Sequence, residues 1–211
     1  MTTKQRKIAL MGFRSVGKSS LTIQFVEGQF VDSYDPTIEN TFYKKIKVKG
    51  QEYSLKLVDT AGQDEYSIFP HEYALDIHGY CLVYSINNLK SFEVVKVIYD
   101  KLLELTGKIQ VPIILVGNKV DLHLERCVST QDGKDLANYM HAQFVEVSAK
   151  ENSAVNNLFT SLIMAIEHGL PTSSSSSLLS SSSSSSSANK TANDHQTIDQ
   201  TNNKHNKCIV S

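Results

Sequence analysis

The sequence predicts an α/β fold, in which a mostly parallel six-stranded sheet with one antiparallel strand has helices on both faces. Residues 111–116 form an apolar run without polar alternation, which is typical of a strand buried on both faces. Amphipathic helical segments alternate with such strands along the chain, the order expected of a parallel sheet. Segments 40–48 and 53–58 instead alternate apolar with polar residues, and they predict a β-hairpin that supplies the antiparallel strand.

The expected elements follow one another from the N-terminus. Strand 7–11 is predicted from its run of apolar residues, and helix 19–26 from apolar residues at helical spacing. The hairpin comes next and turns through Lys49-Gly50-Gln51-Glu52. Beyond it, strands and helices alternate as strand 79–86, helix 91–105, strand 111–116, helix 130–141, strand 143–147 and helix 154–168.

Length and composition predict one folded domain with an unpacked extension. Of the 211 residues, 40% are hydrophobic, and residues 1–170 contain all the alternating elements. Residues 171–207 are rich in Ser and Asn and have too little apolar content to bury a core, so we expect a disordered linker there. Residues 208–211 form a separate terminal motif.

Charge and cysteine content narrow the classes of function. A net charge of −1 without a long basic run argues against nucleic acid as the main partner. Cys81, Cys127 and Cys208 are too widely spaced for a metal site or a disulfide framework, which favours a reducing cytosol. Residues 1–7 are polar, and the apolar run 8–11 is too short for a signal peptide or a membrane span, so we expect the chain to start in the cytosol.

A complete phosphate-binding loop, Gly12-Phe13-Arg14-Ser15-Val16-Gly17-Lys18-Ser19, lies between a predicted strand and a predicted helix. Its glycines allow successive backbone N–H groups to wrap a polyphosphate, and the helix directs its positive end at the same anion. We expect Lys18 to reach the β- and γ-phosphates and the Ser19 hydroxyl to coordinate Mg²⁺.

Three further motifs stand just after predicted strands, where open α/β sheets bind ligands. Asp59-Thr60-Ala61-Gly62-Gln63 offers its carboxylate to Mg²⁺ through water, and the N–H of its glycine to a γ-phosphate. Asn118-Lys119-Val120-Asp121 offers its carboxylate to the N1–H and exocyclic amine of guanine, a pair of donors that adenine lacks. Ser148-Ala149-Lys150 completes the base pocket. The four motifs together predict a guanine-nucleotide site.

Through these motifs, residues 5–169 resemble the Ras superfamily, and the stretches 12–20, 35–41 and 59–70 resemble one branch of it in particular. The resemblance implies a P-loop GTPase fold and a monomeric switch that is active with GTP and inactive with GDP. It also implies an enzyme that slowly hydrolyses GTP to GDP and phosphate, with Mg²⁺ as cofactor.

The resemblance assigns individual roles around the phosphates. Thr37 would close onto Mg²⁺ and the γ-phosphate, so that the segment around it is ordered only with GTP. Phe30 would pack on the guanine, and Tyr34 would lie over the phosphates. Gln63 corresponds to the residue that orients the attacking water.

By motif and resemblance, the expected site falls into four sets. The catalytic set is Gln63, Thr37 and Tyr34. The metal ligands are Ser19, Thr37 and, through water, Asp59. The effector region is Tyr34, Asp35, Pro36, Thr37, Ile38, Glu39 and Asn40. The nucleotide-binding set is Arg14, Ser15, Val16, Gly17, Lys18, Ser19, Ser20, Phe30, Val31, Asp32, Tyr34, Pro36, Thr37, Gly62, Asn118, Lys119, Asp121, Ser148, Ala149 and Lys150.

Arg14 distinguishes the chain from Ras proper, which has Gly at this position. Its side chain would project toward the γ-phosphate, into space where a GTPase-activating protein inserts an arginine. The branch with Arg here implies a tuberin-type activating protein, which inserts an asparagine, and the TOR kinase complex as effector in growth and nutrient control. Two alternatives stay open: a GTP-loaded binding module that hydrolyses too slowly to matter, and a metabolic P-loop kinase, against which the base motif argues.

The chain ends in Cys208-Ile209-Val210-Ser211, a C-a-a-X motif whose Ser favours farnesyl on Cys208. We therefore expect a prenyltransferase as a partner. The farnesyl group would place the protein on the cytoplasmic face of endomembrane, lysosomal or plasma membranes, with a cytosolic pool. The linker has no second Cys, and Lys190, Lys204 and Lys207 are scattered, so the single lipid would anchor weakly.

Overall fold

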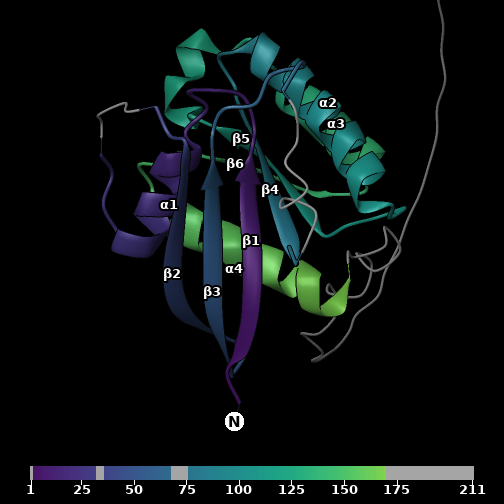
Figure 1. Cartoon of the computed structure of the whole chain (residues 1–211). Helices are drawn as coiled ribbons and strands as arrows, with labels where there is room; N and C mark the ends of the chain where they lie inside the picture. The colour runs from purple at the N-terminus through teal and green to yellow at the C-terminus, as the bar shows by residue number, and fades with distance from the viewer. Residues whose placement is uncertain (1, 32–35, 68–75, 170–211) are drawn as a thin grey trace, which may run out of the picture. The chain divides into compact units, whose positions relative to one another are not determined.

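The computed structural model describes residues 2–31, 36–67 and 76–169 (Figure 1). The expected linker and C-a-a-X motif, from 171 to 211, lie outside the described residues, as do Asp32, Tyr34 and Asp35 of the expected site. In the described part of the chain, no helix is both long and apolar enough to cross a membrane.

The described domain is built on a six-stranded sheet with the strand order β2-β3-β1-β4-β5-β6. β2 is antiparallel to β3, and the other neighbouring pairs are parallel, so the predicted mostly parallel sheet with one antiparallel strand is confirmed. The strands are β1 (Lys4–Met11), β2 (Glu39–Val48), β3 (Gln51–Thr60), β4 (Gly79–Ser85), β5 (Ile113–Asn118) and β6 (Gln143–Val147).

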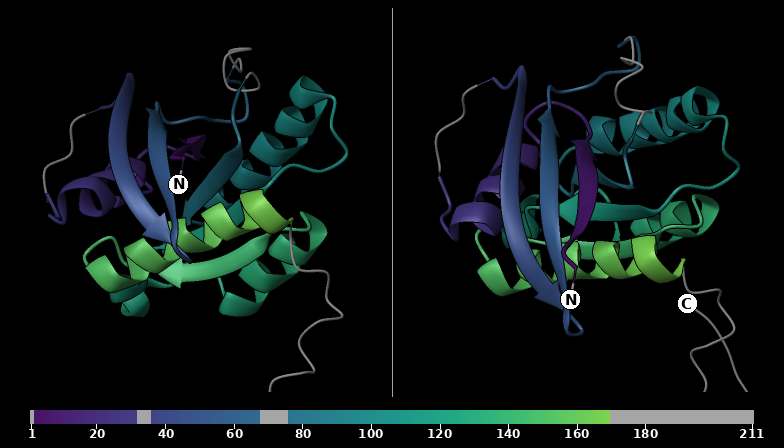
Figure 2. Two further views of the ribbon diagram at one scale, coloured as in Figure 1. Left: turned by 90° about the horizontal axis from the view of Figure 1, so that it is seen from below. Right: turned by 60° about the horizontal axis from the view of Figure 1, so that its bottom comes forward.

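Helices cover both faces of the sheet (Figures 1 and 2). One face carries α1 (Lys18–Glu27) and α4 (Asn152–His168), which touch through stacked Phe25 and Phe159 rings with centroids 4.0 Å apart. The opposite face carries α2 (Leu89–Thr106) and α3 (Thr130–Tyr139). Burial follows helical spacing in the last helix, whose buried residues are Val155, Leu158, Phe159, Leu162, Ile163 and Ala165.

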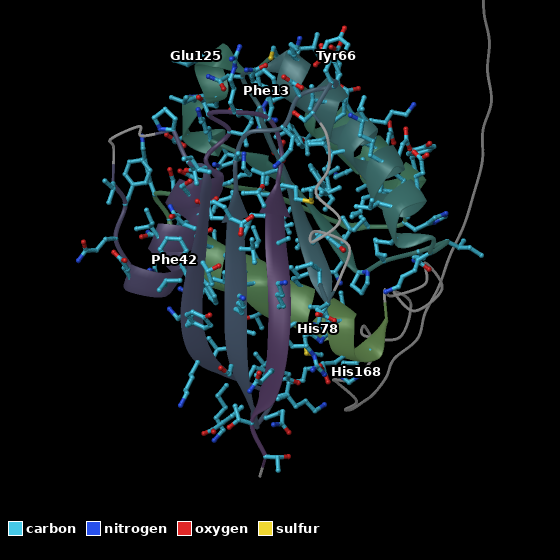
Figure 3. All side chains as sticks on the ribbon, viewed as in Figure 1. Phe13, Phe42, Tyr66, His78, Glu125 and His168 are labelled. Carbon is cyan, nitrogen blue, oxygen red and sulfur yellow. The ribbon has the colours of Figure 1, made fainter. Side chains whose placement is uncertain are left out.

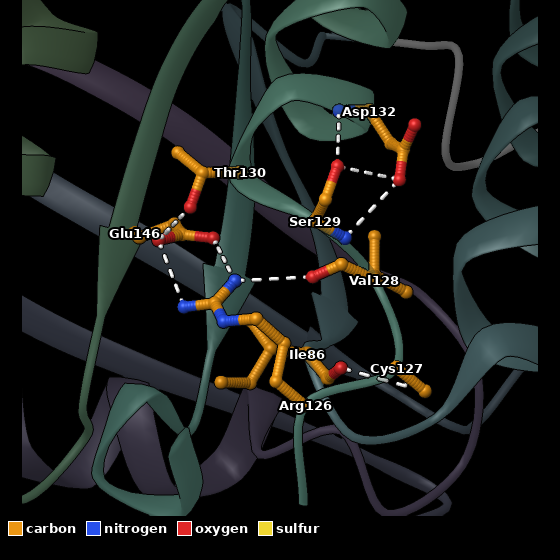
Figure 4. Close-up of polar contacts among 8 residues, drawn as sticks. All are labelled: Ile86, Arg126, Cys127, Val128, Ser129, Thr130, Asp132 and Glu146. Atoms are coloured by element: carbon orange, nitrogen blue, oxygen red, sulfur yellow. Dashed lines mark hydrogen bonds and ion pairs between the residues drawn. The ribbon is translucent and has the colours of Figure 1, made fainter. Parts of the chain in front are cut away.

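Side-chain bonds fix the segment between β5 and β6 (Figure 4). Arg126 makes two bonds to the Glu146 carboxylate on β6, with Nη–Oε distances of 2.6 and 3.1 Å. The Thr130 hydroxyl donates to the same carboxylate at 3.0 Å. Ser129 and Asp132 form a capping box that satisfies the free N–H groups at the start of α3. The segment from Arg126 to the start of α3 is therefore tied to β6.

Several element bounds differ from those predicted. β5 begins at Ile113 and runs to Asn118, two residues beyond the apolar run, because its ladder continues to Ser85 on β4 and Val147 on β6. A 3₁₀ segment, Val120–Glu125, was not expected at all. Hydrogen bonding to the neighbouring strands, rather than apolar content, determines where β5 ends. The strand therefore includes Asn118, the first residue of the base motif.

Gly133→Ala should destabilise the protein. Alanine inside a helix ordinarily gains about 1 kcal/mol over glycine. A Cβ on Gly133 would, however, lie 2.5 Å from Phe144 Cζ and 2.6 Å from the Tyr84 hydroxyl oxygen. We expect the free energy of unfolding, measured by denaturant titration, to fall by about 1–3 kcal/mol through overpacking. Exposed Lys134→Ala on the same helix should shift it by less than about 0.5 kcal/mol, and a gain of stability in Gly133→Ala would contradict this packing.

Candidate functional site

A cavity of about 910 Å³ opens at the carboxyl edge of the parallel strands. Ligand sites in proteins are commonly of this size, up to about 1,000 Å³. The lining residues come from all four motifs and from the segment around Thr37. They are Arg14, Ser15, Gly17, Lys18, Ser19, Ser20, Phe30, Val31, Pro36, Thr37, Thr60, Ala61, Gly62, Asn118, Lys119, Asp121, Leu122, Ser148, Ala149 and Lys150.

The expected nucleotide-binding set and this lining agree except at a few positions. Val16 does not line the cavity, because its side chain is buried in the core. Thr60, Ala61 and Leu122 line it without having been expected. Thr60 and Ala61 lie within the motif 59–63, and Leu122 directly follows the base motif. Their positions in or beside a motif could have predicted from the sequence that they line the cavity.

Close backbone approach explains the two glycines of the phosphate loop. Gly12 has φ of 149°, and a Cβ on it would lie 2.1 Å from the Val83 carbonyl oxygen. Gly17 has φ of 97°, and its Cβ would lie 2.3 Å from Nδ2 of Asn118. Any larger residue at either position would force the loop away from the strands behind it. The loop is therefore shaped by contact with β4 and β5.

Lys18 is buried at the floor of the loop. Its Nζ donates to the carbonyl oxygens of Gly12 at 2.8 Å and Phe13 at 3.0 Å. Burial lowers the pKa of Lys18 to about 8, and the nearby Asp59 carboxylate opposes part of this shift. A bound polyanion would supply the negative charge that a buried ammonium lacks here.

Ser19, Thr37 and Asp59 gather where a cation would be stabilised. The Ser19 and Thr37 hydroxyl oxygens lie 2.9 Å apart. Both carboxylate oxygens of Asp59 are buried, and neither has a hydrogen-bond partner among the described residues. Burial raises the pKa of Asp59, although Ser19 and Lys18 oppose the shift. An unpaired buried carboxylate beside two hydroxyl groups fits a hard cation such as Mg²⁺.

The protein alone would not enclose such a cation. Within residues 2–31, 36–67 and 76–169, no group of three or more His, Cys, Asp or Glu side chains could hold a metal ion. Mg²⁺ commonly takes one or two protein ligands and completes its shell with water and substrate phosphates. The donor set therefore fits a cation that arrives with a polyphosphate.

Asn118 ties the phosphate loop to the base loops. Its Nδ2 donates to the Val16 carbonyl at 2.8 Å, and its Oδ1 accepts from the Ala149 N–H at 3.1 Å. The side chain is 1% exposed, so both bonds are shielded from water. Three motifs that are far apart in the sequence thus meet at a single amide.

Asp121 lies at the far side of the cavity with both carboxylate oxygens engaged. The Ser148 hydroxyl donates to Oδ1 at 2.7 Å, and Lys150 Nζ lies 2.8 Å from Oδ2. Burial works to raise the pKa of Asp121, but the bonds from Lys150 and Ser148 outweigh it and hold the pKa below its usual range. The Lys150 ammonium also lies 5.5 Å from the Phe30 ring centroid. A planar base could enter here by displacing this flexible ammonium.

The Gln63 side chain does not reach the cavity. Its Oε1 accepts from the Gly12 N–H at 2.8 Å, and its Nε2 donates to Thr60 Oγ1 at 2.7 Å and to the Ala61 carbonyl at 2.5 Å. Only 6% of the residue is exposed. The amide lies behind the phosphate loop because that loop and the end of β3 offer it three partners. The expected water-orienting position is therefore not adopted.

Arg14 is also turned aside, although it borders the cavity. Its guanidinium carbon lies 5.4 Å from the centroid of the Phe13 ring, a cation–π contact. The residue also lines a smaller hollow of about 290 Å³ that includes Gln63 and the exposed Tyr66. Phe13 and Tyr66 mark this end of the molecule in Figure 3.

The described part of the effector region is exposed. Ile38 is 89% exposed, and Glu39 and Asn40 at the start of β2 are also exposed. Tyr34 and Asp35 lie outside the described residues. An almost fully exposed isoleucine next to the cavity is the kind of side chain that a protein partner covers.

Comparison with known proteins agrees with these features. The Ras family model matches residues 7–168. The chain is 66% identical to the GTP-binding protein Rheb homolog of Drosophila melanogaster over 168 residues, which cover 80% of this chain and 92% of that protein. It is 66% identical to the GTP-binding protein Rheb of Homo sapiens over 165 residues, 78% of this chain and 90% of that protein. It is 55% identical to the GTP-binding protein rhb1 of Schizosaccharomyces pombe over 164 residues, 78% of this chain and 89% of that protein.

The family match covers residues 7–168, which include all the residues that line the cavity, so the fold predicted as a P-loop GTPase is confirmed. The chain therefore belongs to the Ras family and is a small GTPase of the Rheb type, which binds guanine nucleotide and hydrolyses GTP.

Proposed function

We propose that this protein cycles between a GTP-bound active state and a GDP-bound inactive state, with the nucleotide in the 910 Å³ cavity. The observation that carries the proposal is the 2.9 Å approach of Thr37 to Ser19 beside the unpaired Asp59 carboxylate. Ser19 lies on α1, whereas Thr37 lies outside any helix or strand. A segment whose Thr37 contacts Ser19 at the cavity can respond to what the cavity contains.

Ser19, Thr37 and, through water, Asp59 would hold Mg²⁺ together with the nucleotide phosphates. When bound, the ion would neutralise charge on the phosphate oxygens. Lys18 would bind the β- and γ-phosphates from the floor of the loop, exchanging its bonds to backbone carbonyls for bonds to anionic oxygens. The Gly62 N–H would donate to the γ-phosphate, so this contact is lost after hydrolysis.

Guanine selection would depend on Asp121. Its carboxylate would accept from N1–H and the exocyclic amine of guanine, while Ser148 keeps it oriented through the 2.7 Å bond. Adenine presents no matching donors and would leave the carboxylate unpaired. Phe30 would pack on the base from one side of the cavity.

Hydrolysis by the isolated protein would be slow, because both candidate side chains are engaged by other residues of the protein. Gln63 is bonded behind the phosphate loop, and Arg14 stacks on Phe13. This arrangement also supports the second candidate function, a GTP-loaded binding module whose state is set by nucleotide exchange. Single-turnover hydrolysis with and without a cytosolic extract distinguishes the two, since only a switch should be accelerated by an activating protein.

We infer the signalling role from the Rheb-type resemblance. The GTP form would engage the TOR kinase complex through the effector region 34–40, and a tuberin-type protein would accelerate hydrolysis. Farnesyl on Cys208, added by a prenyltransferase, would place the domain 1–170 on a cytoplasmic membrane face through the linker 171–207. Co-precipitation of TOR complex with GTP-loaded and GDP-loaded protein tests the effector assignment, which fails if the two forms bind equally.

Asp121→Asn should change the preferred base. An amide in place of the carboxylate pairs with xanthine, so the variant should lose GTP affinity and gain affinity for xanthosine triphosphate. Nucleotide competition measured by fluorescence gives both affinities. Asp100→Asn on α2, which makes the same charge change away from the cavity, should alter neither. If Asp121→Asn still prefers GTP by a large factor, the base assignment fails.

Asp59→Asn should make the protein insensitive to magnesium. In the GDP-bound protein, removing Mg²⁺ with a chelator should lower the melting temperature, because the Asp59 charge is left buried and unpaired. The neutral amide should shrink this magnesium-dependent difference, while Asp100→Asn should retain it. Thermal unfolding with and without Mg²⁺ is the measurement, and an undiminished difference in Asp59→Asn would place the ion elsewhere.

Gln63→Leu should lower the stability of the protein and leave its rate of GTP hydrolysis nearly unchanged. It leaves the buried Gly12 N–H without an acceptor, which lowers the free energy of unfolding by about 1–3 kcal/mol. Single-turnover hydrolysis should stay near the ~10⁻⁴ s⁻¹ typical of Ras alone and change by less than about tenfold, as it should in Arg14→Gly. Exposed Gln131→Leu on α3 serves as the control. A collapse of the rate in Gln63→Leu or in Arg14→Gly would make that side chain catalytic.

A further inference from the structure

The sheet formed by β2, β3 and β1 has one face that no described helix covers (Figure 1). On its other face, Lys44 donates to the Phe25 carbonyl on α1, and Arg6 pairs with Glu167 on α4. Side chains alternate along a strand, so the odd-numbered residues of β1 and β2 point away from these helices. The even-numbered residues of β3 share this open face, since Tyr43 is opposite Lys56.

Lysines dominate the open face. Lys45 and Lys47 of β2 are exposed, as is Lys49 in the turn that follows. Lys56 of β3 and Lys7 of β1 are half-buried and paired in register, so they extend the basic surface across three strands. We call these five residues the lysine face.

Little negative charge offsets the lysine face. Among the strand residues on this side of the sheet, the carboxylates are Glu52 beside Lys47 and Glu39 at the far end of β2. In the part of the chain that the structure describes, none of the five ammonium groups forms an ion pair. The whole chain nevertheless has a net charge of −1, so positive charge is concentrated here.

The described domain ends at the same end of the sheet as the hairpin turn, on the face that α1 and α4 cover. Glu167, near the end of α4, bonds Lys4 at 2.5 Å and Arg6 at 2.6 Å at the start of β1. Lys4 is in register with Tyr53, close to the turn that contains Lys49. His168 accordingly lies at the end of the molecule opposite to Phe13 (Figure 3). The segment that leads to Cys208 therefore starts at the same end of the sheet as the hairpin turn.

We infer that the lysine face docks on an anionic lipid bilayer and supplies a second membrane signal. The inference rests on the proposed prenylation, because a single lipid chain gives marginal membrane binding and stable anchoring needs a second contribution. The linker offers only scattered lysines for this. A lysine near an anionic leaflet strengthens binding by about fivefold, so several together are enough to convert weak anchoring into stable residence.

The test compares two triple variants of the full farnesylated chain. The face variant is Lys45→Gln, Lys47→Gln and Lys56→Gln. The control variant is Lys96→Gln, Lys108→Gln and Lys134→Gln, which removes the same charge from the exposed surface of α2, α3 and the loop after α2. Cosedimentation is measured with vesicles of phosphatidylcholine alone and with vesicles that also contain phosphatidylserine, the anionic lipid that attracts basic residues to a leaflet. Guanine-nucleotide affinity, measured on each sample, verifies the fold.

We expect the face variant to lose on the order of 100-fold in binding to the phosphatidylserine vesicles, with the control variant losing less than about fivefold. Binding to phosphatidylcholine should be equal in all three proteins. Equal losses in the two variants, or no loss in either, would overturn the inference and leave the lysines as a solvated surface or a site for another polyanion. Absence of wild-type binding to phosphatidylcholine would count against the prenyl anchor, while the comparison on phosphatidylserine would still decide the role of the face.

Discussion

The Asn118 side chain is the contact on which the rest of the site depends. It joins Val16 in the phosphate loop to Ala149 in the base loop, and it does so from the end of a central strand. Gly17 approaches its amide so closely that a Cβ would lie 2.3 Å away. The separation of the phosphate and base subsites is therefore set by one buried amide, and a nucleotide of fixed length can fit both.

Much of the fold could be predicted because its signals are local. Apolar runs identify the buried strands, and helical spacing identifies the helices. The end of β5 could not be found this way, since Gly117 and Asn118 resemble a turn and are kept in the strand by their ladders to β4 and β6. The motif residues of the cavity were predictable for a different reason: phosphate and base chemistry demand particular residues at particular spacing.

The directions in which the side chains point could not be predicted from sequence motifs. A motif places Gln63 next to the phosphates, but it does not say whether the amide faces water or the protein. Here Gly12, Thr60 and Ala61 offer three hydrogen-bond partners on the protein side. Each such bond has a net value of about 0.5–1.5 kcal/mol, so bringing the amide into the cavity would cost several of these contributions at once. An activating partner would have to replace them or supply the catalytic group itself.

The two charged regions of the protein obey different energetics. Asp59 and Lys18 are buried, where a charge with only partial compensation is costly, so a cation beside Asp59 and an anion beside Lys18 would stabilise the arrangement. Lysines on the open sheet face remain hydrated, and their isolated charges cost almost nothing to leave unpaired. Their effect becomes large only when many of them meet one extended anionic surface, because the separate small attractions then add. The buried charges are thus suited to a compact ligand, whereas the dispersed lysines are suited to binding an extended anionic surface.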